Sequence, residues 1–192
     1  MESIILSGER VHLRDWMLTD LEAFAHWQQP GQQWQELDGP YYPGPKADDI
    51  SGIVERIKTR IESGNFSTPR QNLIIALRES NQLIGQVSRY WISEETNWLA
   101  AGISIYDPAL WGQGYGAEAL SLWTGYLFAA FPQIVRLDLQ TWSGNPGMMK
   151  LATKLGYQLE GRFRQARIVR GEYFDALGYG ILREEWEARS PK

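Results

Sequence analysis

The sequence contains no cysteine, which excludes disulfide bonds, thiolate metal ligands and a cysteine nucleophile. It also lacks any apolar run of the ~18 residues that a membrane-spanning helix needs. The opening residues MESIIL are too few and too acidic for a signal peptide. We therefore expect a cytoplasmic protein that makes no use of a membrane.

An excess of basic residues is missing too, because 19 lysines and arginines face 23 aspartates and glutamates, for a net charge of −4. Binding to nucleic-acid phosphates requires a concentrated basic surface, so no nucleic-acid partner is expected. The two histidines have no third ligand in view, which argues against a metal site. With 43% hydrophobic residues, the chain suits a single folded domain over residues 1–192.

The first half of the chain is predicted to hold a short strand and two helices. The strand covers residues 11–13, and the first helix begins at the capping-box pattern Thr19-Asp20-Leu21-Glu22. The second helix begins at Asp48 or Asp49 and ends near Ser63-Gly64. Between them, residues 30–45 hold prolines, glycines and large aromatics without a period, which predicts a loop with binding character.

Alternating hydrophobic residues predict a mostly antiparallel sheet in the rest of the chain. The predicted strands are 73–77, 83–89, 98–106, 135–139, 157–169 and 173–182. A helix follows a glycine-rich turn after Pro108 and joins two strands, so that pair is expected to be parallel. A further short helix opens at Asn145 and stops at Gly156.

The glycine-rich turn is the most informative stretch. It reads WGQGYGA over residues 111–117 and leads from a strand into a helix. Glycine permits positive φ and a close approach of the main chain to a ligand, and the N–H groups at a helix start attract phosphate oxygens. A tight connection without a ligand is the alternative. The spacing matches neither the dinucleotide-binding fingerprint nor a Walker loop.

This turn resembles the acetyl-CoA pyrophosphate loop of the GNAT superfamily of N-acetyltransferases, whose pattern is Gln/Arg-x-x-Gly-x-Gly/Ala. Gly114 and Gly116 fall on the two small positions of that pattern. The polar first position is occupied by Trp111, a departure associated with the ribosomal-protein acetyltransferase-like (RimJ/RimL-type) branch.

Two further motifs are similar to the same family. Asn145 is followed eleven residues later by Gly156 and then by Tyr157, as in the second family motif. The ending carries LEGR at 159–162, GEYFD at 171–175 and ILREEW at 181–186. The resemblance therefore covers nearly the whole chain from Gly8.

The resemblance implies a mixed α/β (α+β) fold. It would be a single GNAT domain with a central, mostly antiparallel seven-stranded sheet, a splayed parallel pair of strands and about four flanking helices. Acetyl-CoA would be the co-substrate, with its pantetheine arm on the main chain in the splay and its pyrophosphate on the glycine-rich turn. The residues implied to bind it are Ser104, Ile105, Tyr106, Trp111, Gly112, Gln113, Gly114, Tyr115, Gly116, Ala117 and Asn145.

The implied reaction is direct transfer of an acetyl group to a primary amine, either a protein N-terminus or a small amine such as an antibiotic, polyamine or amino-sugar. The acceptor ammonium must lose a proton, the oxyanion must be stabilised and the departing thiolate must be protonated. A backbone N–H near Ile105 or Tyr106 could stabilise the oxyanion. Family likeness also suggests a homodimer.

Two carboxylates are candidates for the base. Strand alternation from Tyr157 and Leu159 places Glu160 on the opposite face of its strand, and the alternative is a solvated carboxylate. Asp175 is the second candidate. Its alternative is an ion pair with Arg162, Arg164 or Arg167.

The group that protonates the thiolate has no candidate. Family members hold a tyrosine or a serine at positions where this chain has Ala152 and Met148. An alternative function is therefore a CoA-binding or sensing domain that has lost transfer chemistry, and a general nucleotide-binding α/β protein is a third.

The loop at 30–45 supplies the predicted substrate contacts, which are Trp34, Tyr41 and Tyr42. The aromatic and acidic run at 34–38 would suit a cationic acceptor.

Overall fold

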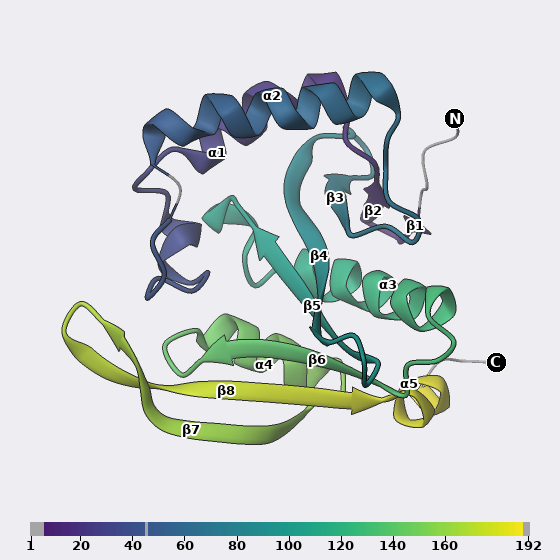
Figure 1. Cartoon of the computed structure of the whole chain (residues 1–192), viewed down its shortest axis with the longest axis vertical. Helices are drawn as coiled ribbons and strands as arrows, with labels where there is room; N and C mark the ends of the chain where they lie inside the picture. Colours follow the sequence, from purple (N-terminus) through teal and green to yellow (C-terminus); the bar gives the residue numbers. More distant parts are fainter. Residues whose placement is uncertain (1–5, 45, 190–192) are drawn as a thin grey trace. The chain divides into compact units, whose positions relative to one another are not determined.

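The computed structural model describes residues 6–44 and 46–189, and Figure 1 traces their course. Residues 1–5 of the signal-peptide prediction and Pro45 of the predicted loop lie outside this part. The chain divides into two compact units. The first unit comprises the chain up to Val87 together with Ile103–Leu122, and the second comprises Ser88–Gly102 and the chain from Trp123 on.

One mixed sheet has the hydrogen-bonded strand order β1-β2-β3-β4-β5-β6-β8-β7. The strands are β1 (Leu6–Ser7), β2 (Val11–Arg14), β3 (Asn72–Leu77), β4 (Leu83–Ser93), β5 (Trp98–Ile105), β6 (Arg136–Trp142), β7 (Gln158–Val169) and β8 (Glu172–Leu182). The predicted parallel pair is confirmed as β5 and β6, whereas β2 with β3 and β8 with both β6 and β7 are antiparallel. The fold class is therefore as predicted, with the two-residue β1 as an eighth strand in the described chain.

The described chain holds five α-helices and three short 3-10 turns. The helices are α1 (Leu21–Gln28), α2 (Ala47–Ser63), α3 (Tyr115–Ala130), α4 (Pro146–Lys154) and α5 (Arg183–Arg189). The 3-10 turns are η1 (Leu18–Asp20), η2 (Gln33–Glu36) and η3 (Pro108–Leu110). Only α5 was missed among the helices, because its seven residues are too short for a clear hydrophobic period.

The starts of the first two helices differ from the sequence prediction. Thr19 lies inside η1, and the capping carboxylate is Asp20, which accepts the N–H of Met17 at 2.8 Å and pairs with Arg14 at 2.7 Å. The predicted box on Thr19 and Glu22 is therefore wrong. Helix α2 begins earlier than predicted, and Asp49 reaches back to the N–H of Lys46 at 3.1 Å. Its end at Ser63, with left-handed Gly64, is as predicted.

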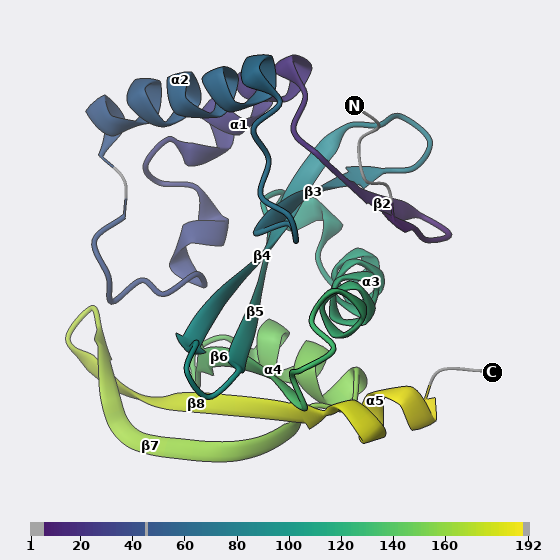
Figure 2. The same cartoon turned by 45° about the vertical axis from the view of Figure 1, so that its right-hand side comes forward.

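The first unit is held by α1 and α2, which pack against each other (Figures 1 and 2). Their apolar sides join a buried cluster with β3, β4 and the residue that follows β5. Its members are Trp16, Phe24, Trp34, Ile57, Ile74, Ala76, Leu83 and Tyr106. The cluster matters for function because it fixes Tyr106 and with it the end of β5.

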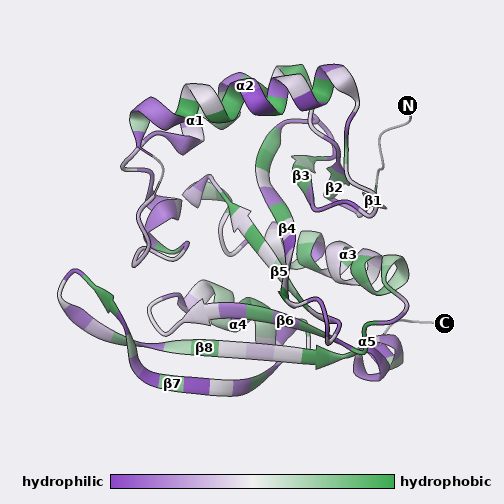
Figure 3. Cartoon of the chain, viewed as in Figure 1, coloured by the Kyte–Doolittle hydropathy of each residue, from purple (hydrophilic) through white to green (hydrophobic). Residues whose placement is uncertain are grey.

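The second unit is built on the β6–β8–β7 ladder, whose last two strands run side by side in Figures 1 and 2. Strand β7 is largely hydrophilic in Figure 3, as expected of an edge strand with exposed faces. On β6, Leu137 and Leu139 are fully buried. The Arg183 guanidinium donates to the carbonyls of Phe128 and Phe131 at 3.0 and 2.9 Å, so it closes the end of α3.

Candidate active site

The glycine-rich turn has the backbone conformation that its sequence predicts. Asp107 caps η3 by accepting the N–H of Ala109 at 2.9 Å. Gly112 and Gly114 then take φ values of +72° and +95°, in the left-handed region, and α3 begins at Tyr115. A residue with a Cβ would be strained at either glycine, so both are needed for this entry into the helix.

Side chains of the first unit hold the turn from both ends. The indole N–H of Trp111 donates to the carbonyl of Ile105 at 2.9 Å. The Arg10 guanidinium lies over the Tyr115 ring at 3.9 Å and donates to the carbonyl of Gln113. Glu118, in the first turn of α3, accepts the N–H of Arg10 at 2.9 Å. The turn is therefore tied to β2 and to β5.

The main chain of this turn presents unpaired amides. The N–H of Glu118 donates to the carbonyl of Gly114 at 3.1 Å and opens the hydrogen bonding of α3. Within the described chain, the N–H groups of residues 112–117 have no such partner. Amides at the start of a sixteen-residue helix carry the positive end of its dipole, so this turn can bind an anion.

The end of β5 has an unpaired edge. Pairing with β6 runs from Leu99 to Ala101, whereas β5 continues to Ile105. The N–H of Tyr106 donates to the carbonyl of Ile84 in β4 at 2.9 Å. Because the N–H groups of successive strand residues point to opposite edges, that of Ile105 points away from β4. Of the two predicted oxyanion donors, Tyr106 is thus already bonded, which leaves Ile105.

Replacing Trp111 by Phe tests the link between the turn and this strand end. The variant keeps the aromatic packing but loses the N–H that bonds Ile105. We expect the free energy of unfolding to fall by about 1 kcal/mol, the usual net value of one hydrogen bond. Urea denaturation measures it. No change in the unfolding midpoint would show that this bond does not hold the turn.

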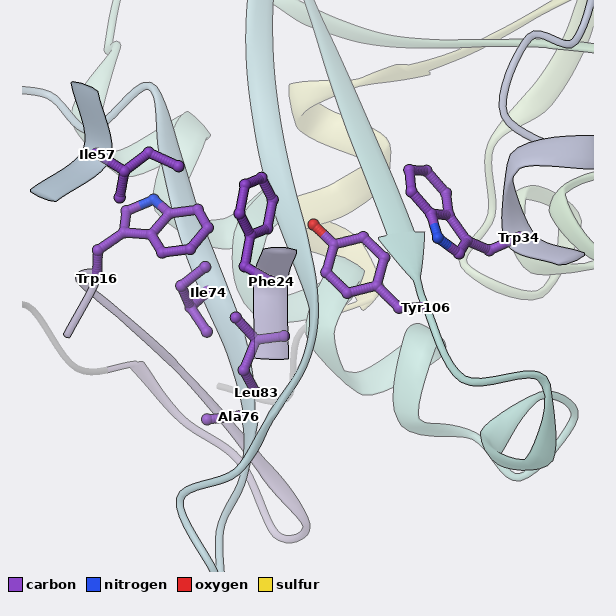
Figure 4. Packing of buried hydrophobic residues seen from close by; sticks show 8 residues of the cluster. All are labelled: Trp16, Phe24, Trp34, Ile57, Ile74, Ala76, Leu83 and Tyr106. Atoms are coloured by element: carbon purple, nitrogen blue, oxygen red, sulfur yellow. The ribbon is translucent and has the colours of Figure 1, made fainter. Parts of the chain in front are cut away.

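The predicted substrate residues differ in exposure. Trp34 is only 8% exposed and packs at a ring-centroid distance of 4.9 Å on Tyr106, which Figure 4 shows between Phe24 and Trp34. Its indole N–H donates to the carbonyl of Trp27 at 2.8 Å. Tyr42, in contrast, is 65% exposed, and its ring meets that of Tyr41 edge-on. Trp34 has a clear packing role, and a substrate contact stays a prediction for all three.

In the second unit, Asn145 caps α4 as predicted. Its side-chain oxygen accepts the N–H of Met148 at 2.9 Å, and Pro146 follows at the first helical position. Ala152 is fully buried in the same helix, and Gly156 ends it with a φ of +89°. Neither Met148 nor Ala152 brings an acid, as the sequence indicated.

Glu160 lies at an irregular point of β7. Leu159 pairs with Tyr179 and Gly161 with Gly178, so Glu160 is an extra, bulged residue. The side chain still lies on the face opposite Leu159, as alternation predicts, because it reaches over Gly180, which pairs with Gln158. Its carboxylate pairs with Arg136 at 2.5 Å, and Arg136 also pairs with Asp138 at 2.6 Å. Burial raises the pKa of Asp138, and hydrogen bonds from Arg136 and Trp98 oppose that rise.

Asp175 forms the ion pair that the sequence analysis held open. Its carboxylate accepts the backbone N–H of Gln165 at 2.8 Å and pairs with Arg162 at 2.5 Å. Both groups lower the pKa of Asp175 below that of an ordinary aspartate, and the backbone N–H of Gln165 has the larger effect. A carboxylate stabilised in this way is a weaker base.

The lowered pKa predicts how Asp175→Asn depends on pH. A lowered folded-state pKa adds stability above the unfolded-state pKa of ~3.9, and this stability is lost as the pH falls through the folded value. We expect the variant to melt below wild type at neutral pH and the gap to close in acid. Thermal melts from neutral pH to about pH 3 measure it. A gap independent of pH would contradict the assignment.

Sequence reasoning missed Arg10 and Glu118, and it named Asp38 only as part of the acidic run at 34–38. Arg10 and Glu118 clamp the glycine-rich turn across more than a hundred residues of chain, and Asp38 accepts the Ser104 hydroxyl at 3.4 Å. No local motif signals these contacts, because each joins distant segments. Between residues 6 and 189, Pro45 aside, no three His, Cys, Asp or Glu residues gather as metal ligands, and no helix is long and apolar enough to cross a membrane.

The chain is similar in sequence to known acetyltransferases. The family model described as "Acetyltransferase (GNAT) domain" matches residues 10–158, most of the chain. The chain belongs to the GNAT acetyltransferase family. Among curated GNAT relatives, the "Uncharacterized N-acetyltransferase p20" of Bacillus licheniformis is 23% identical over 94% of this chain and 97% of its own length. YokL, a prophage-derived uncharacterized N-acetyltransferase of Bacillus subtilis, is 23% identical over 80% of each chain.

Solved GNAT structures share the fold. A GNAT-family acetyltransferase from Bacillus anthracis superposes with a TM-score of 0.74 at 20% identity, covering 95% of this chain and all of that one. RimL, the ribosomal L7/L12 α-N-protein acetyltransferase in complex with coenzyme A, gives 0.70 at 18% identity over 95% and 99% of the two chains. Both the sequence motifs and these structural neighbours are consistent with placing the chain in the RimJ/RimL-like branch of the family.

Proposed function

We propose that this GNAT protein transfers the acetyl group of acetyl-CoA to a primary amine on a small molecule or a protein N-terminus. The observation that carries the proposal is the run of unpaired amides at residues 112–117, which begins a few residues after the unpaired edge of β5. Family membership adds the chemistry, since the curated relatives are named N-acetyltransferases.

The turn suits the diphosphate of acetyl-CoA in charge and in shape. Its amides carry no competing hydrogen bond, and its alternate glycines add no side chain that would keep a ligand from the main chain. The Glu118 carboxylate, which would repel an anion at this helix start, is instead engaged by the N–H of Arg10. Residues 111–117 are thus proposed to hold the diphosphate, and Ser104 and Ile105 the pantetheine arm. A contact of Asn145 with that arm stays a prediction from the sequence.

Ile105 has a defined part in the transfer step. When the amine nitrogen attacks the thioester carbon, negative charge develops on the carbonyl oxygen, and the Ile105 N–H can donate to it. A new C–N bond forms, the C–S bond breaks and the thiolate leaves with CoA. Glu160 and Asp175 remain the sequence-based candidates for the base, and no side chain is assigned to protonate the thiolate.

Two classes of amine are proposed as the acceptor. RimL is named for acting on the α-amino group of a ribosomal protein, and a similar protein N-terminus is one acceptor proposed here. Small alkyl amines are the other class. A homodimer and a cytoplasmic location stay predictions from the sequence.

Release of free CoA from acetyl-CoA, measured with and without added amine, tests the proposal. Amine-dependent release, with the acetylated amine identified by mass spectrometry, is the expected result. Tight CoA binding without turnover across a broad amine panel would instead favour the sensing domain. The comparisons do not favour that alternative.

A further inference from the structure

Asp38 lies over the end of β5 in the first unit. The Ser104 hydroxyl donates to its carboxylate at 3.4 Å, and Ser104 directly precedes Ile105. The residue that the carboxylate contacts is therefore one strand residue, ~3.3 Å along the chain, from the proposed oxyanion donor. The aspartate is also solvent-exposed, so a dissolved molecule can reach it.

The segment that carries Asp38 is fixed in place. Trp34, at the start of η2, packs on Tyr106, which shares a strand face with Ser104 because the two are separated by one residue. The indole N–H of Trp34 is bonded to α1 through Trp27. Asp38 is thus held on this face by buried packing as well as by its hydrogen bond.

Aromatic rings pack beside Gly39, the residue that follows Asp38. Gly39 has a φ of +63°, and a Cβ there would lie 3.4 Å from the Tyr42 ring and 3.9 Å from that of Tyr41. The two tyrosines therefore pack beside the residue that follows Asp38. A segment that carries a carboxylate and two tyrosine rings within five residues is suited to an organic cation.

The charges near Asp38 are few. Within the described chain it forms no ion pair. The neighbouring titratable groups are Glu36 in the same segment, the phenols of Tyr41 and Tyr42, and the Tyr106 phenol on the facing strand. Burial, and to a smaller extent the charge of Asp38, raises the pKa of Tyr106, so that phenol stays protonated. The protein atoms around its carboxyl group raise the pKa of Asp38, although part of the residue is open to solvent, and the hydrogen bond from Ser104 opposes that rise.

We propose that Asp38 binds the ammonium group of the acceptor and accepts its proton before acetyl transfer. This inference rests on the proposed function and assigns the base within it. Asp38 is both accessible and without a cationic partner, whereas Glu160 pairs with Arg136 and Asp175 with Arg162. Its raised pKa brings it closer to that of a useful general base.

The proton balance closes with this assignment. Asp38 takes one proton from the alkylammonium, R–NH3+, and passes it to solvent. The neutral nitrogen attacks the thioester carbon, the C–N bond forms and the C–S bond breaks. A second proton leaves the nitrogen as the amide forms, and the thiolate is protonated. One proton is released for each amide and each free CoA formed.

Asp38→Asn tests the inference against acceptors that differ in protonation. With spermidine, glucosamine or a short peptide bearing a free α-amino group, kcat/KM should fall by about 100-fold at neutral pH. With 4-methoxyaniline, which is already neutral at that pH, the loss should stay within about fivefold. The loss with spermidine should also shrink as rising pH supplies neutral amine. Acetyl-CoA affinity should not change.

Three matched variants accompany this experiment. Glu22→Gln removes an exposed carboxylate of α1, outside the run at 34–38, and should keep kcat/KM within about twofold of wild type. Asp38→Glu keeps a carboxylate and should restore most of the activity with spermidine, which distinguishes a lost base from a misfolded segment. Glu160→Gln should leave the ratio of the spermidine and 4-methoxyaniline rates unchanged.

Several results would overturn the inference while the proposed function stands. The first is that Asp38→Asn acetylates spermidine as fast as the wild-type protein does. The second is that Asp38→Asn loses as much activity with 4-methoxyaniline as with spermidine. The third is that Glu160→Gln, and not Asp38→Asn, loses activity with spermidine alone. If the wild-type chain itself releases no CoA with any of the four acceptors, the proposed function fails and the inference fails with it.

Discussion

A Gly116→Asp variant is expected to bind acetyl-CoA about 100- to 1,000-fold more weakly than wild type. Gly116 lies in the first turn of α3, where a diphosphate and a carboxylate would compete for the same amides. One unit charge about 4 Å from another costs ~4 kcal/mol near a protein surface. The fold should not suffer, because an acidic residue at a helix start adds ~0.3–1 kcal/mol of stability.

A large loss of acetyl-CoA affinity without a loss of stability would identify the turn as a binding site. Calorimetric titration gives the affinity for acetyl-CoA, and a thermal melt gives the stability. Gly116→Ala is the matched control, because the family pattern accepts alanine there, and it should bind acetyl-CoA as wild type does. Gly114 would be less informative, since its φ of +95° makes any side chain costly. Wild-type affinity in Gly116→Asp would remove the diphosphate from this turn.

Ile105→Pro is expected to lower kcat by about 100- to 1,000-fold, the usual loss when one oxyanion donor is removed. Proline lacks the N–H, and at Ile105 that N–H points away from β4, so no ladder bond is lost there. Proline is tolerated at such an edge position of a strand. The affinity for acetyl-CoA should change much less than kcat, because the diphosphate contacts remain.

Steady-state kinetics on Ile105→Pro and Ile105→Val separates the amide from the side chain. The valine variant keeps the N–H and should have a kcat close to wild type. Circular dichroism should show the same secondary structure for both. A proline variant as active as the valine variant would show that another group stabilises the oxyanion.

The chain order of the elements could be predicted because it follows from local patterns. The crossover helix after Pro108 required a parallel pair, and β5 with β6 is that pair. Asn145 and Gly156 carry the start and stop signals of α4 in their own residue types. The glycine-rich turn was likewise visible, because positive φ at Gly112 and Gly114 is what those residues permit.

The placement of charged groups could not be predicted, because it depends on contacts between distant segments. Asp38 meets Ser104 across 66 residues, and Arg10 meets the turn across 103. The bulge at Glu160 could not be predicted for a different reason. A bulge between Leu159 and Gly161 breaks the two-residue period of β7, and no feature of that sequence announces it.

Calorimetric titration of acetyl-CoA into the wild-type protein is the most direct test of the account, which requires the amides of residues 112–117 to hold a diphosphate. Saturable binding with a Kd between about 1 μM and 1 mM is the predicted result. Acetyl-pantetheine, which lacks the diphosphate and the nucleotide, should bind far more weakly in the same experiment. A folded sample that gives no binding heat with acetyl-CoA, or equal affinity for the two compounds, would contradict it.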